Sequence, residues 1–395
     1  MRPLSQRARS VPTSGIRTIM ELAARLPDVI HLEVGEPDAV TPEPIIQAAV
    51  TAARAGFTKY TATAGLTSLR EALVQKIRLR NDLRATVEQV VATPGSVFAL
   101  ASAVLAIIDQ GDEALIPDPG WPNYASMLTL AGASVVPYPL VRETGYQPDL
   151  AALARLITPR TKLLVINSPA NPTGAVFPPE TVRALVELAA RHDLYLIADE
   201  VYEEFVYEGE HVPAARFDSD GRVVSVFGFS KSYAMTGWRL GYALASPQIA
   251  GMMARLAEPF VSCPSSLSQK AAEAALAGSQ DPVVQMRESY RTRRDVVVDI
   301  LGSQGLLAAV PHGAFYALVD LSRVSTDSMQ LARQLLEEQR VATAPGETFG
   351  RLGTGLVRIS FAAERSLLGE GCRRIVRFVG SNARAGRPVD KSPLC

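Results

Sequence analysis

The sequence predicts an α/β protein in which a large domain, built on a mostly parallel β-sheet covered by helices, is followed by a smaller α+β domain. Three observations lead to this prediction. The chain has 395 residues, which is too long for one ordinary core. From about residue 87 to 245, short apolar runs alternate with helical patterns, as in the crossover units of a parallel sheet. After residue 280 long helices are separated by single strands, which indicates the second unit.

The elements of the predicted sheet follow one another in a regular order. A strand at VVATP leads into the helix SVFALASAVLAIID, and a strand at GDEALIPDP ends in a turn. A strand at KLLVINSP is followed by the loop ANPTG and the helix PPETVRALVELAARHD, and then by strands at LYLIADE and VVSVFGFSK. Loops at the carboxyl ends of such strands carry the chemistry in open α/β sheets, so we expect the functional residues there.

The carboxyl-terminal third contains a helix at VVQMRESYRTRRDVVVDILGS, a strand at GAFYALVDL, a helix at DSMQLARQLLEEQR, a strand at GLVRISFA and a final helix. We therefore predict a large domain over residues 41–280 and a small one over 281–380. Residues 381–395 are polar and contain proline and glycine, which favours a flexible tail.

The composition favours small-molecule chemistry in a reducing compartment. Forty basic residues balance forty acidic ones, so no net field attracts nucleic acid or an anionic membrane. The three cysteines lack paired spacing, and the four histidines lack the spacing of a metal site. No signal peptide and no run of about 18 apolar residues is present. We expect a cytoplasmic protein without a metal.

The segment FSKSYAMTGWRLGY contains the first candidate site. Lys231 follows Ser230 directly and precedes Arg239 by eight residues. A lysine amine can form a Schiff base with a carbonyl cofactor, while a hydroxyl and a guanidinium can hold a phosphate dianion. The alternative is an ordinary solvated surface, because these residue types are mostly exposed.

A second candidate lies where the apolar strand LYLIAD ends. Asp199 would emerge at the carboxyl edge of the sheet, with Tyr202 close behind it. Beside a pyridine ring, such a carboxylate would keep the ring nitrogen protonated, and Tyr202 could hydrogen-bond the ring's phenolic oxygen. The alternative is an aspartate that caps the following segment.

Three further strand ends carry weaker signals. Gly95, Ser96 and Val97 stand where a strand turns into a helix, which suits an anion, although a serine N-cap explains the same residues. Asn171 lies in a proline-rich loop that would aim its amide at a cofactor oxygen, or it is a plain turn residue. Trp121 could stack on a planar ring or belong to the core.

Taken in order, eight motifs resemble those of the class I/II aminotransferases, which are fold-type I pyridoxal-phosphate enzymes. They are LEVGEPD, KYTATAGLTSLREAL, DPGWPNY, NSPANPTG, ADEVY, SKSYAMTGWRLGY, PHGAFY and GLVRISFA. The resemblance covers about residues 10 to 380. It implies a sheet of the seven-stranded type, pyridoxal 5'-phosphate as cofactor, and an N-terminal segment, residues 1–40, that packs with the small domain over the active site.

The resemblance also implies roles for single residues. Lys231 would be the Schiff-base lysine and Asp199 the partner of the pyridine nitrogen. Tyr202 and Asn171 would bind the phenolic oxygen, and Trp121 would stack on the ring. The cofactor phosphate would be held by a group of loop residues, namely Gly95, Ser96, Val97, Ser230 and Arg239.

Two implied roles concern the substrate and a second subunit. Arg358 would bind the substrate α-carboxylate through a two-pronged salt bridge, with the backbone of Gly35, Trp121 and Asn171 nearby. Tyr60 would reach the phosphate of the neighbouring subunit, which implies a homodimer. The sequence departs from some members of the family at two positions. Tyr124 stands where they carry a histidine and Val97 where they carry a lysine.

The implied reaction moves an amino group from an L-α-amino acid to a 2-oxo acid, with 2-oxoglutarate as the expected acceptor, in a ping-pong cycle. A pyridoxal-phosphate lyase or cyclase remains an alternative, because the fold also serves other α-carbon chemistry. An aminotransferase-like transcriptional regulator is disfavoured, since the motifs begin near residue 10, and a nicotinamide enzyme is disfavoured by the absence of GxGxxG.

The number of positive charges in the pocket decides which amino acids we expect as donors. A dicarboxylic donor such as aspartate needs a second cation in the pocket. The helix after Val97 offers none, and Arg17 in the N-terminal segment is the one alternative that the sequence suggests. We therefore expect neutral or aromatic donors to be preferred to aspartate.

Overall fold

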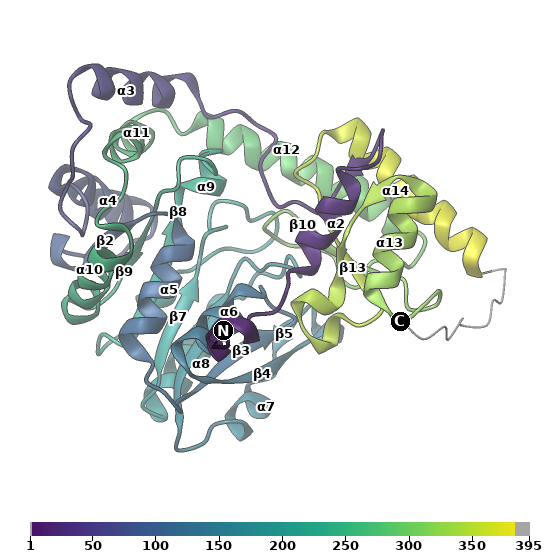
Figure 1. The fold of residues 1–395 in the computed structure, drawn as a ribbon, viewed down its shortest axis with the longest axis horizontal. Helices are drawn as coiled ribbons and strands as arrows, with labels where there is room; N and C mark the ends of the chain where they lie inside the picture. Colours follow the sequence, from purple (N-terminus) through teal and green to yellow (C-terminus); the bar gives the residue numbers. More distant parts are fainter. Residues whose placement is uncertain (1, 384–395) are drawn as a thin grey trace.

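A large central sheet and a smaller three-stranded sheet form the framework of the protein in the computed structural model, which describes residues 2–383 (Figure 1). Strands of the large sheet come from residues 90–244, and those of the small sheet from residues 316–360. The two sheets lie in separate parts of the molecule, and helix α12 (Asp281–Val297) runs from one part to the other (Figure 1).

The large sheet has eight strands in the order β2-β9-β8-β7-β6-β3-β4-β5. Neighbouring strands are parallel from β4 through β3, β6 and β7 to β8, while β9 and β5 run antiparallel to their neighbours. The prediction of a mostly parallel sheet is therefore confirmed. The sheet has one strand more than the expected seven, and the shortest is the two-residue β5. The bounds are β2 Val90–Thr93, β3 Glu113–Asp118, β4 Ser134–Val141, β5 Gln147–Pro148, β6 Thr161–Asn167, β7 Tyr195–Asp199, β8 Val223–Gly228 and β9 Gly241–Leu244.

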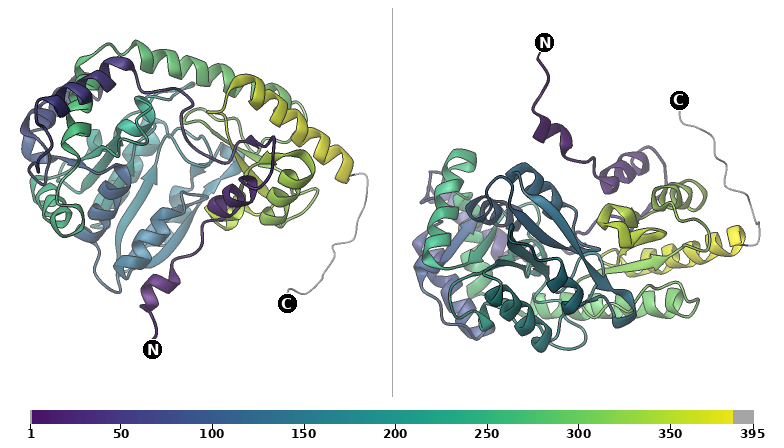
Figure 2. Two further views of the ribbon diagram at one scale, coloured as in Figure 1. Left: turned by 45° about the horizontal axis from the view of Figure 1, so that its top comes forward. Right: turned by 90° about the horizontal axis from the view of Figure 1, so that it is seen from below.

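Both faces of this sheet are buried, because side chains that alternate along each strand enter two different cores. On β6, Leu164 and Ile166 pack in a core with helix α8 (Pro179–Arg191). The intervening Leu163 and Val165 pack in the opposite core, with helices α5 (Ser96–Ile107) and α10 (Pro247–Val261). The period of two along a strand therefore produces a helix layer on each face, as Figure 2 shows.

The small sheet has the order β10-β13-β12, and a separate two-stranded pair joins β1 to β11 in parallel. This pairing ties the N-terminal segment to the carboxyl-terminal part of the chain. Helix α2 (Gly15–Ala23) also contacts α13 and β12. The bounds are β1 Ile30–His31, β10 Tyr316–Asp320, β11 Val341–Ala342, β12 Ala344–Pro345, β13 Leu356–Ser360, α13 Ser328–Gln339 and α14 Arg365–Ala383.

The remaining elements connect and cover these sheets. The helices are α1 Gln6–Ser10, α3 Glu43–Arg54, α4 Thr67–Arg80, α6 Asn123–Ala131, α7 Leu150–Arg155, α9 Phe229–Ser232 and α11 Ser266–Ala277. Helix α12 continues into a π-helical turn over Val298–Gly302. The predicted tail at 381–395 is helical up to Ala383, where α14 ends, and its residues 384–395 lie outside the described part of the chain.

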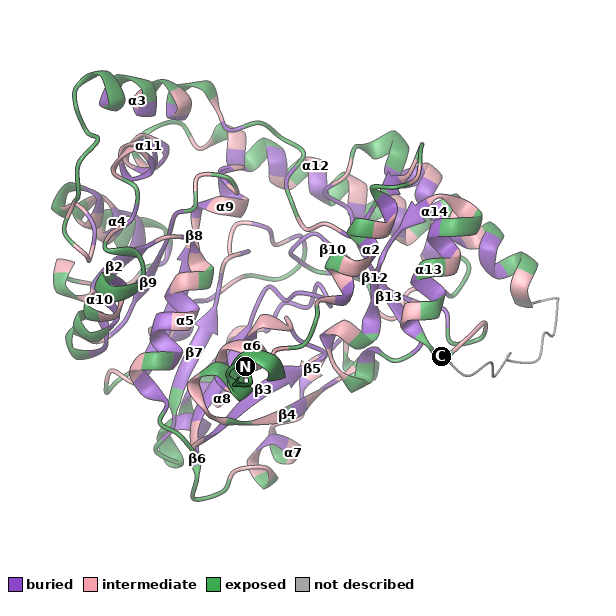
Figure 3. Cartoon of the chain, in the orientation of Figure 1, coloured by how far each residue is buried: buried purple, intermediate pink, exposed green. Residues whose placement is uncertain are grey.

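Burial follows this architecture, with buried strands at the centre and exposed faces on the outer helices (Figure 3). Over residues 2–383, no helix is both long enough and apolar enough to cross a membrane. The carboxyl ends of β6, β7 and β8 meet at one edge of the large sheet, where the NSPANPTG loop, Asp199 and Lys231 follow them.

Candidate active site

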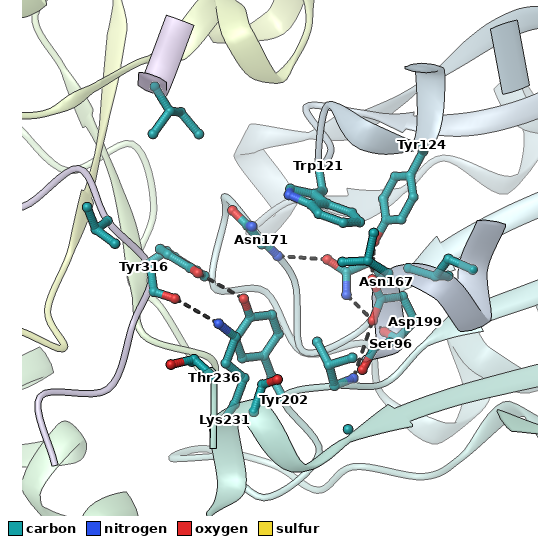
Figure 4. Close-up of a pocket in the computed structure, with 18 of the residues that line it drawn as sticks. Ser96, Trp121, Tyr124, Asn167, Asn171, Asp199, Tyr202, Lys231, Thr236 and Tyr316 are labelled. Atoms are coloured by element: carbon teal, nitrogen blue, oxygen red, sulfur yellow. Dashed lines mark hydrogen bonds between the residues drawn. The ribbon is translucent and has the colours of Figure 1, made fainter. Parts of the chain in front are cut away.

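A cavity of about 270 Å³ opens at this edge, between the large sheet and the small one. Figure 4 shows the side chains that converge on it. The predicted site residues among its lining come from both parts of the chain: Gly35, Ser96, Val97, Trp121, Asn171, Asp199, Tyr202, Ser230, Lys231, Arg239 and Arg358. Of the predicted residues, Gly95 and Tyr60 are not among its lining.

Lys231 lies in the short helix α9, which begins directly after strand β8. Its Nζ atom donates a hydrogen bond of 2.8 Å to the backbone oxygen of Gly35 (Figure 4). Burial lowers the pKa of Lys231 to about 8, and the positive charges of Arg239 and Arg358 act in the same direction. The amine is therefore neutral, and nucleophilic, at a lower pH than an ordinary lysine.

Asp199 is the last residue of β7 and is buried. The hydroxyl of Tyr124 donates a hydrogen bond of 2.6 Å to its Oδ2 atom, and the backbone N–H of Val201 donates to Oδ1. Burial raises the pKa of Asp199 to about 6, against these hydrogen bonds, which lower it. Among the described residues no basic side chain forms a salt bridge with it, so the carboxylate is available to a cationic ligand.

Sequence reasoning missed two residues that hold this site together. Asn167 accepts a hydrogen bond of 2.8 Å from the backbone N–H of Asn171 and donates one of 2.9 Å to the backbone oxygen of Asp199. The hydroxyl of Tyr316 lies 2.8 Å from that of Tyr202 (Figure 4). Both residues belong to motifs that the sequence analysis singled out, NSPANPTG and PHGAFY, so the signal was present without a role attached to it.

The N-terminus of helix α5 and the residues beside it form a group of hydrogen-bond donors, which we call the α5 cradle. Gly95, with φ +82°, precedes Ser96, whose hydroxyl donates to the backbone oxygen of Phe227. A Cβ atom on Gly95 would lie 2.6 Å from Arg239 Nη2, and one on Gly228 would lie 2.3 Å from Ser96 Oγ. The two glycines therefore keep backbone, hydroxyl and guanidinium close together at a helix N-terminus. This donor set fits a phosphate group.

Arg358 lies on β13 and is buried. Its Nη1 donates a hydrogen bond of 3.0 Å to Oδ1 of Asn171, and its Nη2 donates a hydrogen bond to the backbone oxygen of Glu33. The guanidinium stacks between the rings of Tyr316 and Phe349, at 4.4 and 4.8 Å from their centroids. Its Nε has no hydrogen-bond partner among the described residues. A buried guanidinium without a salt bridge fits a carboxylate ligand.

Three residues that the sequence analysis named, Tyr60, Val97 and Arg17, are more exposed than the buried residues of the site. Tyr60 is 88% exposed on the monomer, and Val97 is 40% exposed while still lining the cavity. Arg17, the alternative cation considered for a dicarboxylic donor, is exposed and is not among the lining residues. Helix α2, which carries Arg17, contributes the apolar residues Ile16 and Met20 to the cavity lining instead.

Comparison with known proteins agrees with this geometry. Aspartate/prephenate aminotransferase of Thermus thermophilus is 40% identical over 96% of this chain and 100% of its own length. Arginine–pyruvate transaminase of Pseudomonas aeruginosa is 37% identical over 88% of this chain and 89% of its own. The structure of aromatic aminotransferase from Pyrococcus horikoshii superposes with a TM-score of 0.87, at 35% identity, and covers 93% of this chain and 99% of that one.

These relatives are all aminotransferases by name, which favours amino-group transfer over the lyase or cyclase alternative. The family model for aminotransferase class I and II matches residues 27–375, which is nearly the whole chain. The chain therefore belongs to the class I and II aminotransferases, and it is an amino-acid transaminase.

Proposed function

We propose that this transaminase binds pyridoxal 5'-phosphate in the cavity around Lys231 and moves the amino group of a neutral or aromatic L-α-amino acid to a 2-oxo acid, with 2-oxoglutarate as acceptor. One observation carries the proposal. A lysine amine, a carboxylate and a guanidinium, those of Lys231, Asp199 and Arg358, line one cavity, and none forms a salt bridge with another described side chain. A charge that is withdrawn from water and has no opposite charge beside it is costly, so each of the three groups fits a charged part of a ligand.

The cofactor, when bound, supplies an aldehyde and an electron-accepting pyridine ring. Asp199 would hold a proton at the ring nitrogen, and the hydrogen bond from Tyr124 favours its ionised form. Tyr202, oriented by Tyr316, and Asn171 would hold the phenolic oxygen. Lys231 would take the proton from the substrate α-carbon, because its lowered pKa leaves a useful fraction of the amine neutral near pH 8.

The phosphate would lie in the α5 cradle. Backbone N–H groups of Ser96 and Val97 would donate to it, together with Ser230 and Arg239. The α5 helix adds the positive end of its dipole, which favours an anion at this position. Trp121, held edge-on against Tyr124 at a centroid distance of 5.3 Å, would cover one face of the ring.

The substrate α-carboxylate would pair with Arg358, near the backbone of Gly35. We expect Arg358→Lys to weaken the binding of every α-carboxylate substrate by roughly 2–4 kcal/mol, because a lysine cannot donate two parallel hydrogen bonds from a fixed plane. Steady-state kinetics with several amino acids measures this as a common fall in kcat/KM. A fall confined to one class of side chain would contradict the assigned role.

The expected donor preference follows from the charges of the cavity. Its lining contains three basic side chains, Lys231, Arg239 and Arg358, and the proposed chemistry uses all three. No basic lining residue remains for a second carboxylate on this chain. The names of the relatives include aspartate, aromatic and arginine aminotransferases, so they do not favour one class of donor.

The proposal is tested by incubating the purified protein with single amino acids and 2-oxoglutarate and identifying the products. We expect glutamate and the matching 2-oxo acid to form, with larger kcat/KM for phenylalanine, tyrosine, alanine or methionine than for aspartate. Aspartate leading by about tenfold or more would overturn the donor preference. Formation of elimination products in place of glutamate would overturn the proposed transfer.

The functional unit is proposed to be a homodimer in which Tyr60 reaches the partner's phosphate. Exposed apolar side chains support this, since Tyr60, Phe57 and Phe260 are 88%, 39% and 62% exposed. The segments that carry them are neighbours, because Ser266 Oγ donates to the backbone oxygen of Phe57 and the backbone N–H of Thr61 donates to Sγ of Cys263, while the ring of Phe260 lies 6.3 Å from that of Phe98, next to Val97. Exposed apolar side chains on neighbouring segments beside a cavity are typical of an interface, and a monomeric mass by light scattering would contradict the proposal.

A further inference from the structure

A buried carboxylate outside the cavity joins the part of the protein that contains the large sheet to the part that contains the small one. Asp118 is the last residue of strand β3, is 7% exposed, and is not among the residues that line the cavity. Its Oδ2 atom accepts a hydrogen bond of 3.2 Å from the backbone N–H of Arg351, and its Oδ1 atom accepts one of 3.1 Å from that of Leu352. These two donors lie 233 and 234 residues further along the chain.

The two hydrogen bonds take the place of a helix cap. Residues Arg351–Gly353 form a short 3₁₀ turn. The first N–H groups of such a turn lack a carbonyl partner inside it, and a side chain just before the turn usually caps them. The residue at that position is Gly350, which has no side chain and adopts φ +130°. A Cβ atom on it would overlap Oδ1 of Asp118. The glycine therefore leaves room for a cap that comes from the other part of the protein.

A purely structural role for Asp118 would be to cap the end of its own strand. In the described part of the chain, however, the carboxylate accepts its hydrogen bonds from the distant turn. Burial raises the pKa of Asp118, while these two hydrogen bonds lower it. The neighbouring backbone adds a third link, since the N–H of Gly120 donates a hydrogen bond of 2.7 Å to the backbone oxygen of Phe349. Residues 349–352 are thus fixed to the end of β3.

This attachment reaches the cavity from both parts of the protein. Trp121 follows Gly120 directly and lines the cavity. The ring of Phe349 lies 4.8 Å from the guanidinium of Arg358, which also lines the cavity. A guanidinium binds a carboxylate through two parallel hydrogen bonds in one plane, so a ring that packs on the guanidinium helps to set the direction of that plane. The cap from Asp118 therefore relates the position of Arg358 to that of Trp121.

We infer that Asp118 is a positioning residue of the transaminase: through residues 349–352 and the ring of Phe349 it orients Arg358 toward the α-carboxylate of the substrate, without touching substrate or cofactor. The inference rests on the proposed function, because it takes Arg358 as the group that binds this carboxylate. The hydrogen bonds of Arg358 hold its two Nη atoms, and the rings of Tyr316 and Phe349 hold its plane. Loss of the cap would free one of these two rings.

The inference is tested on the cofactor-loaded protein with two unreactive ligands of one shape, 3-phenylpropionate and 3-phenylpropanamide. Both resemble phenylalanine without its amino group, and they differ in charge, so the ratio of their affinities measures the contribution of Arg358. In Asp118→Ala, calorimetric titration should show that the preference for the acid falls by at least about tenfold. Binding of the amide, and of the cofactor to the cofactor-free protein, should change by less than about threefold, because neither depends on the plane of Arg358.

Gly350→Ala tests the same contact from its other side, because the added Cβ atom would overlap the carboxylate of Asp118. We expect a similar fall in the preference for the acid. Since the alanine already displaces the carboxylate, adding Asp118→Ala to this variant should lower the preference by less than about a further threefold. Effects that multiply in the double variant would overturn the inference.

A matched control is Asp320→Ala. The carboxylate of Asp320 also joins the two parts of the protein, through a salt bridge of 2.7 Å to Arg142, and Asp320 does not line the cavity. Both affinities should stay unchanged in this variant.

Three results for Asp118→Ala would overturn the inference: an unchanged preference for the acid, an equal loss for acid and amide, or a loss of cofactor affinity as large as the loss for the acid. If this variant fails to fold, Asp118→Asn decides in the same way, because the asparagine amide keeps one accepting oxygen and loses the other. Wild-type protein that binds the amide as tightly as the acid would refute the role proposed for Arg358, and the inference with it.

Discussion

Replacement of Lys231 by alanine is expected to abolish covalent attachment of the cofactor and to lower turnover by at least about a thousandfold. Lys231 supplies the amine of the cavity, and one residue would serve both to attach the cofactor and to move the substrate proton. Kinetics with the best donor measures the loss of turnover. Borohydride reduction followed by peptide mapping locates the attached lysine in the wild-type protein.

Lys76 provides an internal control for the mapping. It is buried, but its Nζ lies 2.5 Å from Oε1 of Glu203 in an ion pair, and it is not among the residues that line the cavity. We expect no label on it. For Lys231, the rate of attachment to the cofactor-free protein should rise with pH and level off above about 8, since the amine is neutral above its pKa. A label on Lys76, or attachment that rises only near pH 10, would contradict the assignment.

Replacement of Asp199 by alanine is expected to lower turnover by at least about a hundredfold while part of the cofactor stays bound. The contacts proposed for the phosphate remain in this variant, but the ring nitrogen loses the charge that keeps it protonated. Cofactor content measured by absorbance, together with kcat, separates the two effects. Complete loss of the cofactor with an otherwise folded protein, or unchanged kcat, would contradict the role of Asp199.

Tyr124→Phe is the matched control for this prediction. The variant keeps the ring that packs against Trp121 and removes the hydroxyl that donates to Asp199. Because that hydrogen bond lowers the pKa of Asp199, its loss should raise the pKa. We therefore expect a smaller loss of turnover than in Asp199→Ala, concentrated at low pH, where more of the carboxyl group is protonated.

The sequence by itself determined the large sheet and the residues at its edge. A continuous apolar run, such as the four apolar residues in KLLVIN, specifies a strand that is covered on both faces, as the two cores on either side of β6 confirm. Strand ends then predict the placement of Asp199, Asn171 and Lys231, because carboxyl ends of parallel strands meet at one edge. These are local patterns, and local patterns can be read from one sequence.

Only the tertiary structure decided what the small part of the chain contributes. Arg358 and Glu33 are 325 residues apart in sequence, and their contact depends on how β13 packs beside the segment that follows β1. The same packing leaves Arg17 outside the cavity and brings Tyr316 to Tyr202. Within residues 2–383 it also leaves the second carboxylate oxygen of Glu33 without a hydrogen-bond partner. Periodicity specifies which face of an element is buried, but which polar groups lack partners depends on every element packed around them.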